Sequence, residues 1–369
     1  MRNFLIVLLL INATLFFSCE KKTYQKYLPD HENIRYSGRI DFSNDQEPLF
    51  VGSASSAEIG FTGDSCTIFL KKLNPQNESN YVAVELDGEY LGRYELEEDD
   101  FQRFSFPVIP SEKNHVIKIF KATEASNNQI AFGGIRCESL TTLPPASEKK
   151  IEFIGNSITC GMGNDLSDIP CDSGNWFDQH NAYWAYGPIV ARKLGVQFML
   201  SSVSGIGIYR NWNSMSPVMP DVYESLYLNS DDTEKYDFSS YSPDLVSICL
   251  GTNDMSLGDG THERLPFDST TYVKAYIEFI KTVYSKYPGT QICLLTSPMV
   301  KNEKGKLLKR CLEAVQLDVT AELPNKKKIR IFDFPEGIEP HGCSYHPDIE
   351  NHKQMAEALL PFYKEVMSW

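Results

Sequence analysis

Residues 151–159 read IEFIGNSIT and decide the fold of the region that follows them. Their first half is apolar, with the character of a buried β-strand, and their second half is a Gly-Asn-Ser turn. A serine directly after a strand can present its hydroxyl at the carboxyl edge of a sheet, where α/β proteins bind their ligands. Because Gly-Asn-Ser is also an ordinary turn sequence, the meaning of Ser157 depends on the rest of the chain.

From residue 151 to residue 369, short apolar runs alternate with segments of helical period. Strand-like runs follow at 196–200, 245–250, 291–295 and 329–334, and helical segments at 182–194, 272–284, 307–323 and 349–367. This alternation predicts an α/β domain in which helices cover both faces of a parallel sheet.

The chain before residue 151 has a different pattern. Residues 34–142 contain several short strands, one of them followed by the hairpin turn signal Asp87-Gly88, without a convincing helical period. This pattern predicts an antiparallel β-sandwich domain. Residues 143–150 are polar and contain two prolines, so they predict a linker between the two domains.

The first 33 residues predict export rather than a part of the fold. Arg2 precedes an apolar run that is shorter than the roughly 20 residues of a membrane span, so residues 1–19 are interpreted as a signal peptide. Ser18-Cys19 resembles a bacterial lipoprotein cleavage site, with Cys19 lipidated and residues 20–33 as a tether. We expect a lipid anchor in the cell envelope (periplasm or outer membrane), which would be the only contact with a membrane. The alternative is an ordinary secretory signal.

The composition limits the classes of partner. The formal net charge of −14 at pH 7 argues against a nucleic-acid partner, because phosphate binding needs a basic patch. The charge suits an exported protein that acts on a neutral substrate. The hydrophobic content of 42% is ample for packed cores, whereas the oligomeric state stays open.

Eight cysteines remain when Cys19 is set aside, an even number that permits disulfides in an exported protein. Cys249 and Cys293 lie in strand-like runs and are interpreted as small buried side chains. Cys160 and Cys171 flank a loop, and they are the pair that we suspect of forming a disulfide.

Four residues suited to acyl transfer lie at related places in the predicted α/β domain. Ser157, Gly205 and Asn253 each follow a strand-like run, and His346 lies in the loop before the last helix. Strand ends meet at one edge of a parallel sheet, so the four can converge. A histidine can remove the proton of a serine hydroxyl and make it a nucleophile. The Ser157 and Gly205 N–H groups and the Asn253 amide can bind an oxyanion, each donor stabilising the transition state by about 3–4 kcal/mol.

In this order, the four residues resemble the four sequence blocks of the SGNH (GDSL-type) hydrolases. The surrounding sequence is more similar still to carbohydrate esterase family 2, the bacterial acetyl esterases of plant polysaccharides. The resembling stretches are GNSIT at 155–159, YG at 186–187 with ARKLG at 191–195, SGIG at 204–207 with RN at 210–211, Pro220 with Tyr223, GTND at 251–254, and HP at 346–347 with His352 and MA at 355–356.

The resemblance implies a jelly-roll sandwich followed by a three-layer α/β/α SGNH hydrolase domain at 151–369. It implies that Ser157 is the nucleophile, His346 the base, and Gly205 with Asn253 the oxyanion hole. The implied activity is the removal of O-acetyl groups from acetylated plant polysaccharides or oligosaccharides, derived from xylan or glucomannan. No cofactor is expected for this chemistry.

The sequence departs from the resembling families beside the histidine. Many SGNH hydrolases place an aspartate three residues before it, where this chain has Cys343, and some family 2 esterases place one two residues before it, where this chain has Ser344. We therefore expect a Ser-His dyad in which a backbone carbonyl or another side chain accepts the imidazole N–H. The sequence does not identify that third group.

Two further sets of residues have alternative interpretations. The histidines at 341, 346 and 352 match no usual zinc spacing, so no metal site is expected. Trp176 and Trp212 are predicted to stack on sugar rings, although aromatic side chains are more often part of a core.

Two other functions stay open, namely a carbohydrate-binding protein without turnover and an esterase or lipase for aliphatic acyl chains.

Overall fold

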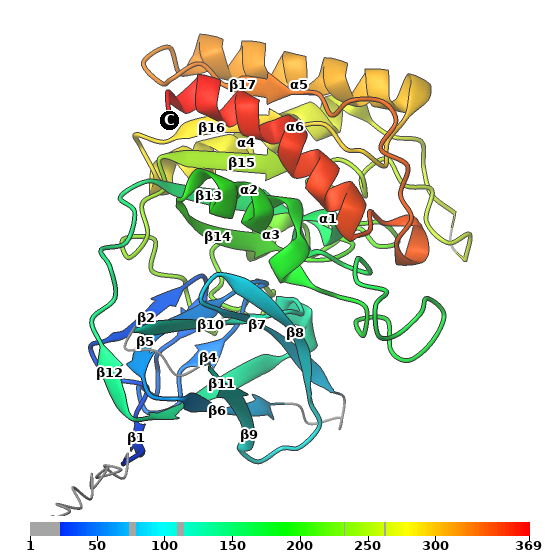
Figure 1. Cartoon of the computed structure of the whole chain (residues 1–369). Helices are drawn as coiled ribbons and strands as arrows, with labels where there is room; N and C mark the ends of the chain where they lie inside the picture. The colour runs from blue at the N-terminus through cyan, green and yellow to red at the C-terminus, as the bar shows by residue number, and fades with distance from the viewer. Residues whose placement is uncertain (1–22, 74–78, 109–113, 232, 262) are drawn as a thin grey trace, which may run out of the picture.

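The computed structural model describes residues 23–73, 79–108, 114–231, 233–261 and 263–369. The predicted signal peptide and Cys19 lie outside the described residues. A β-rich N-terminal part packs against a C-terminal part in which helices cover a sheet (Figure 1). In the part of the chain that the structure describes, no helix is both long enough and apolar enough to cross a membrane.

The N-terminal part is an antiparallel β-sandwich. Its strands are β1 (Gln25–Tyr27), β2 (Ile34–Ser37), β3 (Ile40–Asp41), β4 (Leu49–Phe50), β5 (Ser56–Thr62), β6 (Ser65–Leu73), β7 (Asn80–Leu86), β8 (Glu89–Leu96), β9 (Gln102–Pro107), β10 (His115–Lys121), β11 (Gln129–Cys137) and β12 (Ser139–Thr141). One sheet has the order β3-β4-β11-β6-β9, with β1 against β11, and the other has the order β12-β5-β10-β7-β8, with β2 against β5. Part of the predicted tether at 20–33 belongs to the fold, since it forms strand β1, in which Lys26 pairs with Arg136 of β11.

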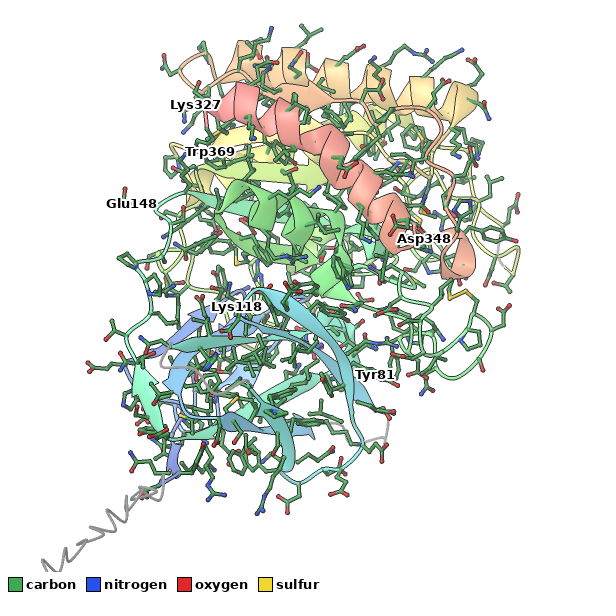
Figure 2. All side chains as sticks on the ribbon, viewed as in Figure 1. Tyr81, Lys118, Glu148, Lys327, Asp348 and Trp369 are labelled. Carbon is green, nitrogen blue, oxygen red and sulfur yellow. A yellow bond between two sulfur atoms is a disulfide. The ribbon has the colours of Figure 1, made fainter. Side chains whose placement is uncertain are left out.

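Strand β7 shows how the sandwich attaches to the rest of the protein. All seven of its residues are buried, which a strand with one solvent-exposed face does not show. Val82 and Val84 point into the sandwich core, whereas Tyr81 and Ala83 belong to a core shared with the α/β part. Figure 2 labels Tyr81 among the side chains of the sandwich. The two parts therefore share a hydrophobic core.

The C-terminal part is a parallel sheet with helices on both faces. Its strands are β13 (Lys150–Gly155), β14 (Gln197–Ser202), β15 (Leu245–Cys249), β16 (Gln291–Leu295) and β17 (Arg330–Phe332), in the order β14-β13-β15-β16-β17. Its helices are α1 (Ser157–Cys160), α2 (Tyr186–Leu194), α3 (Met219–Val222), α4 (Ser269–Lys286), α5 (Asn302–Glu322) and α6 (Ile349–Met367). Three short 3-10 helices complete the elements, η1 (Ala125–Asn127), η2 (Ala182–Trp184) and η3 (Cys343–Tyr345). The predicted fold class is confirmed.

The two faces of the sheet separate its buried side chains into two cores. Phe153 of β13 packs with α2 and α6, whereas the next residue, Ile154, packs with α4 and α5 on the opposite face. Successive side chains of a strand point to opposite faces, so each strand contributes to both layers. Because both faces of β13 are covered, residues 151–155 are all buried, Glu152 among them, and the strand ends in Gly155 at the carboxyl edge of the sheet.

Three helices differ from their predicted bounds. Helix α4 spans Ser269–Lys286 rather than 272–284, and Asp268 caps its start. The predicted helix at 182–194 is interrupted at Ala185, whose extended backbone separates η2 from α2. Helix α5 begins at Asn302, five residues before the predicted start, because its first turn is polar and lacks the apolar period on which the prediction depends.

Candidate active site

Ser157 lies at the junction between β13 and α1, directly after the carboxyl end of the strand. It is buried, with 5% of its surface exposed. Asn156 caps the helix, since its side-chain oxygen accepts from the Ile158 N–H at 3.1 Å. A Cβ atom on Gly155 would lie 2.0 Å from Thr159 Oγ1, so the tight turn in front of Ser157 requires glycine. The local sequence thus fixes the direction of the serine.

His346 is placed to act as the base for Ser157. Its Nε2 atom lies 2.7 Å from Ser157 Oγ, and its Nδ1 atom lies 2.9 Å from the carbonyl oxygen of Ser344. A carbonyl oxygen can only accept, so Nδ1 carries the proton and Nε2 is left to accept the serine proton. The Ser344 carbonyl therefore occupies the third position, where the sequence offers no carboxylate.

The turn that carries this carbonyl has an unusual backbone. Ser344 and Tyr345 have φ angles of 52° and 63°, in the left-handed region that residues other than glycine rarely adopt. Such a conformation persists only where surrounding contacts hold it. Burial lowers the pKa of His346, and the hydrogen bond to Ser344 opposes this effect. The imidazole is consequently neutral near pH 7, as a base must be.

Gly205 and Asn253 line the same cavity as Ser157 and His346. Gly205 has a φ of 77°, and a Cβ atom on it would lie 2.7 Å from Trp212, so glycine is needed on both counts. Asn253 Nδ2 donates to the Ile206 carbonyl at 2.8 Å, which orients the amide and leaves its second N–H for another acceptor. The two candidate oxyanion donors are thus held by the loop after β14.

Asp254 organises that loop rather than facing the cavity. It is fully buried, and its Oδ1 atom accepts from the N–H groups of Ile208 and Tyr209, both at 2.9 Å. Burial raises the pKa of Asp254 to about 6, against the effect of these backbone hydrogen bonds. Asp254 is therefore a structural hydrogen-bonding residue of the loop.

The cavity has a volume of about 920 Å³. Trp176 and Trp212, predicted to stack on sugar rings, both line it and are 47% and 44% exposed. Two other aromatic residues of the α/β part, Trp184 and Tyr209, do not line it. Tyr345 lines the cavity and is 87% exposed, and sequence analysis missed it. The sequence signal that could have identified Tyr345 as a cavity residue was its position directly before His346.

The histidines at 341, 346 and 352 lie in different surroundings. His352 is buried in α6, where its Nδ1 accepts from the Tyr186 N–H at 3.2 Å, and burial lowers its pKa to about 3. His341 is exposed, with Nδ1 3.8 Å from an Asp348 carboxylate oxygen. Among the described residues, no three histidine, cysteine or acidic side chains gather as metal ligands.

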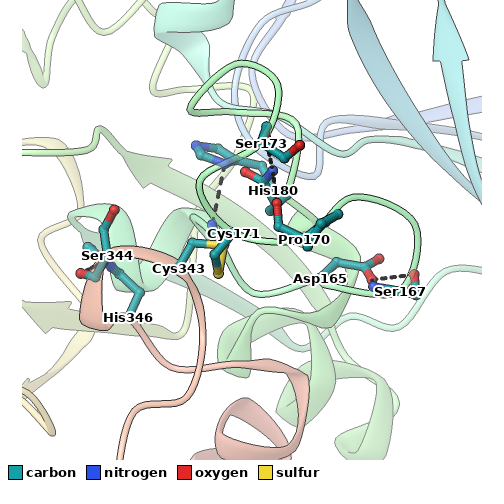
Figure 3. The surroundings of a disulfide bond; sticks show 11 residues. Asp165, Ser167, Pro170, Cys171, Ser173, His180, Cys343, Ser344 and His346 are labelled. Carbon is teal, nitrogen blue, oxygen red and sulfur yellow. Dashed lines mark hydrogen bonds between the residues drawn. A yellow bond between two sulfur atoms is a disulfide. The ribbon is translucent and has the colours of Figure 1, made fainter.

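The suspected disulfide between Cys160 and Cys171 is wrong. Cys171 is bridged to Cys343, with the two Cα atoms 5.2 Å apart (Figure 3). Cys160 is fully buried in α1, where its thiol donates to Ser202 at 3.2 Å. The bridge joins the loop that contains Trp176 to the turn before His346, a pairing of residues 172 positions apart.

Comparisons with known proteins match both parts of the chain. Residues 36–146 match the family described as "Carbohydrate esterase 2 N-terminal", and residues 153–347 match the "GDSL-like Lipase/Acylhydrolase family". The chain is 24% identical over 378 residues to an acetylxylan esterase / glucomannan deacetylase of Cellvibrio japonicus, covering 99% of both chains. It is 30% identical over 348 residues to the cellulase/esterase CelE of Acetivibrio thermocellus, covering 92% of this chain and 40% of that protein's length.

A solved structure is similar over most of the chain. It is a family two carbohydrate esterase from Clostridium thermocellum in complex with cellohexaose, with 29% identity and a TM-score of 0.80. The alignment covers 91% of this chain and 99% of that one. A family two esterase from Cellvibrio japonicus has a TM-score of 0.80 at 22% identity, which supports the fold alone.

Proposed function

Since the chain belongs to carbohydrate esterase family 2, within the GDSL-like lipase/acylhydrolase family, we propose that it removes O-acetyl groups from xylan or glucomannan. It is a carboxylic ester hydrolase by family. The 2.7 Å contact between Ser157 Oγ and His346 Nε2 carries the proposal. The contact lies in a cavity that also presents Gly205 and Asn253.

The first half of the reaction acetylates the enzyme. Ser157 Oγ attacks the carbonyl carbon of the acetyl group, and its proton passes to His346 Nε2. The oxygen that becomes negative is bound by the Gly205 N–H and the second Asn253 amide N–H. When the intermediate collapses, the bond from carbon to the sugar oxygen breaks, and that oxygen takes the proton from His346. The sugar leaves with a free hydroxyl.

The second half releases acetate. A water molecule gives one proton to His346 Nε2 while its oxygen attacks the acetyl carbon on Ser157. The same donors bind the oxyanion, and the bond to Ser157 Oγ then breaks with return of the proton to the serine. His346 needs the same tautomer in both halves, and the Ser344 carbonyl keeps it there. No cofactor enters either half.

The test is acetate release from acetylated xylan and acetylated glucomannan by the wild type and Ser157→Ala. We expect the wild type to release acetate and the variant to lose about 10⁴–10⁶-fold in kcat, because the nucleophile is absent. The same polymers after alkaline deacetylation serve as substrate controls. Equal release by both proteins would overturn the role of Ser157.

A binding function without turnover is the second candidate. The half-exposed Trp176 and Trp212 offer apolar surfaces beside the cavity, and a relative was solved with cellohexaose. Binding of unacetylated oligosaccharide together with no acetate release from any ester would favour this candidate. A preference for long acyl chains over acetyl in synthetic esters would instead favour an aliphatic esterase or lipase.

We further propose that the protein is held in the bacterial cell envelope by a lipid on Cys19, with secretion as the alternative. The Ser18-Cys19 sequence after an apolar run supports this proposal. Labelling of the wild type with radioactive palmitate, and its loss in Cys19→Ala, is the expected result. Labelling that persists in Cys19→Ala would contradict it.

A further inference from the structure

The sandwich places a fully buried carboxylate directly behind the candidate active site. Glu124 lies between β10 and η1 and has no exposed surface. Its Oε2 atom accepts from the backbone N–H of Ser204 at 2.6 Å. Its Oε1 atom lies 3.3 Å from Nε2 of His180. Cys160 Sγ also lies 3.5 Å from Oε2. All three partners belong to the α/β part, so Glu124 connects the two parts of the protein.

Glu124 is ionised in this position. Burial alone would raise its pKa, but hydrogen bonds from His180 and Ser204 hold the pKa below its usual range. His180 Nδ1 accepts from the Gly163 N–H at 3.3 Å, so its proton is on Nε2 and is donated to Glu124. Two N–H donors therefore converge on one buried negative charge, an arrangement in which hydrogen bonds are strongest.

The first connection leads to the oxyanion loop. Ser204 directly precedes Gly205, the candidate oxyanion donor, and the hydrogen bond from Ser204 to Glu124 fixes the backbone at that point. From the other side, Gly205 is held by the Trp212 N–H, which donates to its carbonyl at 2.9 Å. The direction of the Gly205 N–H is therefore set by one contact from the sandwich and one from its own loop.

The second connection leads to the base. His180 accepts from the Gly163 N–H, and the Gly163 carbonyl accepts from the Cys343 N–H at 2.8 Å. Cys343 opens the turn whose next residue, Ser344, supplies the carbonyl that orients His346. Figure 3 shows His180, the disulfide at Cys343 and His346 in one close group. Glu124 is thus connected both to the loop of the oxyanion donor Gly205 and to the turn that orients His346.

We propose that Glu124 is a positioning residue for the ester hydrolysis, supplied by the sandwich, that holds the Ser204–Gly205 loop and the turn before His346. This inference rests on the proposed function in so far as Ser157, Gly205 and His346 carry the reaction. The sandwich then acts in catalysis through Glu124, whether or not it also binds sugar.

The first test is Glu124→Gln, which keeps the shape and removes the charge. One of the two N–H donors must then face the glutamine NH₂ group, so one connection is lost. We expect kcat for 4-nitrophenyl acetate to fall by about 10²-fold, because small misplacements of catalytic groups have effects of that size. The affinity for unacetylated xylohexaose should change by less than about threefold, since binding does not need the oxyanion geometry.

The matched control is Glu85→Gln. Glu85 is also a buried carboxylate of the sandwich, and it also bonds across the interface, accepting from the Tyr183 hydroxyl at 2.8 Å. Its partners are Tyr183 and Lys118 rather than the loops at 204 or 343, so its variant should keep kcat within about threefold of the wild type. An equal loss of kcat in both variants would overturn the proposal, because a general weakening of the interface would then explain it.

A second measurement separates positioning from stability. Phenylboronic acid forms a tetrahedral adduct through a bond from boron to Ser157 Oγ, which imitates the oxyanion intermediate. Its inhibition constant should rise in Glu124→Gln in parallel with the loss of kcat/KM. An unchanged constant, or an unchanged kcat, in a folded Glu124→Gln protein would overturn the proposal.

If Glu124→Gln fails to fold, His180→Phe carries the test. This variant keeps a ring beside Trp176 and removes the hydrogen bonds of His180 to Glu124 and Gly163, while the Ser204 N–H can still donate to Glu124. We expect kcat to fall by about tenfold, and wild-type kcat in this variant would overturn the proposal. Because 4-nitrophenyl acetate reports on the dyad and oxyanion donors, failure of the xylan or glucomannan proposal would leave the result valid.

Discussion

Arg39 and Glu124 are buried charged residues of the sandwich, and they contact the α/β part at different places. Arg39 donates to the carbonyls of Ser225 at 2.7 Å and Tyr223 at 2.9 Å, and its guanidinium lies 4.4 Å from the centre of the Tyr236 ring. None of these partners lines the cavity, whereas Ser204, the partner of Glu124, does. The same kind of contact therefore serves stability at one place and catalytic geometry at the other.

Arg39 belongs to a buried hydrogen-bond network whose residues do not line the cavity. Its Nε donates to Ser201 Oγ at 3.2 Å, and Ser201 in turn donates to Glu152 of β13 at 2.5 Å. Burial raises the pKa of Glu152, and the charge of Arg39 opposes this effect. A buried charge that loses its partner is costly, so Arg39 and Glu152 stabilise the interface as a set.

The largest expected effect on stability is that of Arg39→Met. The variant leaves two carbonyls and the Glu152 region without their cation, so the free energy of unfolding should fall by about 3–5 kcal/mol. The kcat of the folded protein should change by less than about threefold, because the cavity is not touched. Urea unfolding and kcat for 4-nitrophenyl acetate measure the two effects. A loss of kcat as large as that in Glu124→Gln would remove the distinction between the two sites.

Asn253→Ala is expected to show the reverse pattern. Loss of one oxyanion donor should lower kcat by about 10²–10³-fold, equivalent to about 3–4 kcal/mol in the transition state. The free energy of unfolding should fall by only about 1 kcal/mol, since one hydrogen bond to Ile206 is lost. Steady-state kinetics and urea unfolding test this. Near-wild-type kcat would exclude Asn253 from the oxyanion hole.

The disulfide tests the connection between Glu124 and the base. In the double variant Cys171→Ser/Cys343→Ser, we expect the free energy of unfolding to fall by about 2–4 kcal/mol, as is typical for loss of a disulfide. Because Cys343 opens the turn that orients His346, kcat should also fall, by about tenfold. Combined with Glu124→Gln, the losses in kcat should be less than additive, since both changes release the same turn. Fully additive losses would show that the two contacts act separately.

The smallest expected effect concerns pH. His346 accepts a proton only when neutral, so kcat/KM should fall as the pH drops through its pKa. Burial lowers that pKa, which places the acid limb below the ordinary histidine value of about 6.5. The measurement is the pH profile of kcat/KM for 4-nitrophenyl acetate. An acid limb above pH 6.5 would contradict the conclusion that burial dominates the pKa of His346.

Much of the fold was predictable because its signals are local. The alternation of apolar runs and helical periods predicted the parallel sheet, and the four motif residues line one cavity because parallel strands end at one edge. The start of α5 was missed because a polar helical turn has no period to detect. The pairing of Cys171 was missed because sequence spacing says nothing about which loops meet.

The sequence by itself determined the order of the strands and helices and the residue types that carry ester hydrolysis. Only the tertiary structure decided which group orients His346, since a backbone carbonyl has no residue identity to read. It also decided that Glu124 and Arg39 are buried, because both are charged residues in connections between elements, where side chains are normally exposed. The physical reason is that burial depends on the opposing surface, which here includes residues from 56 to 186 positions further along the chain.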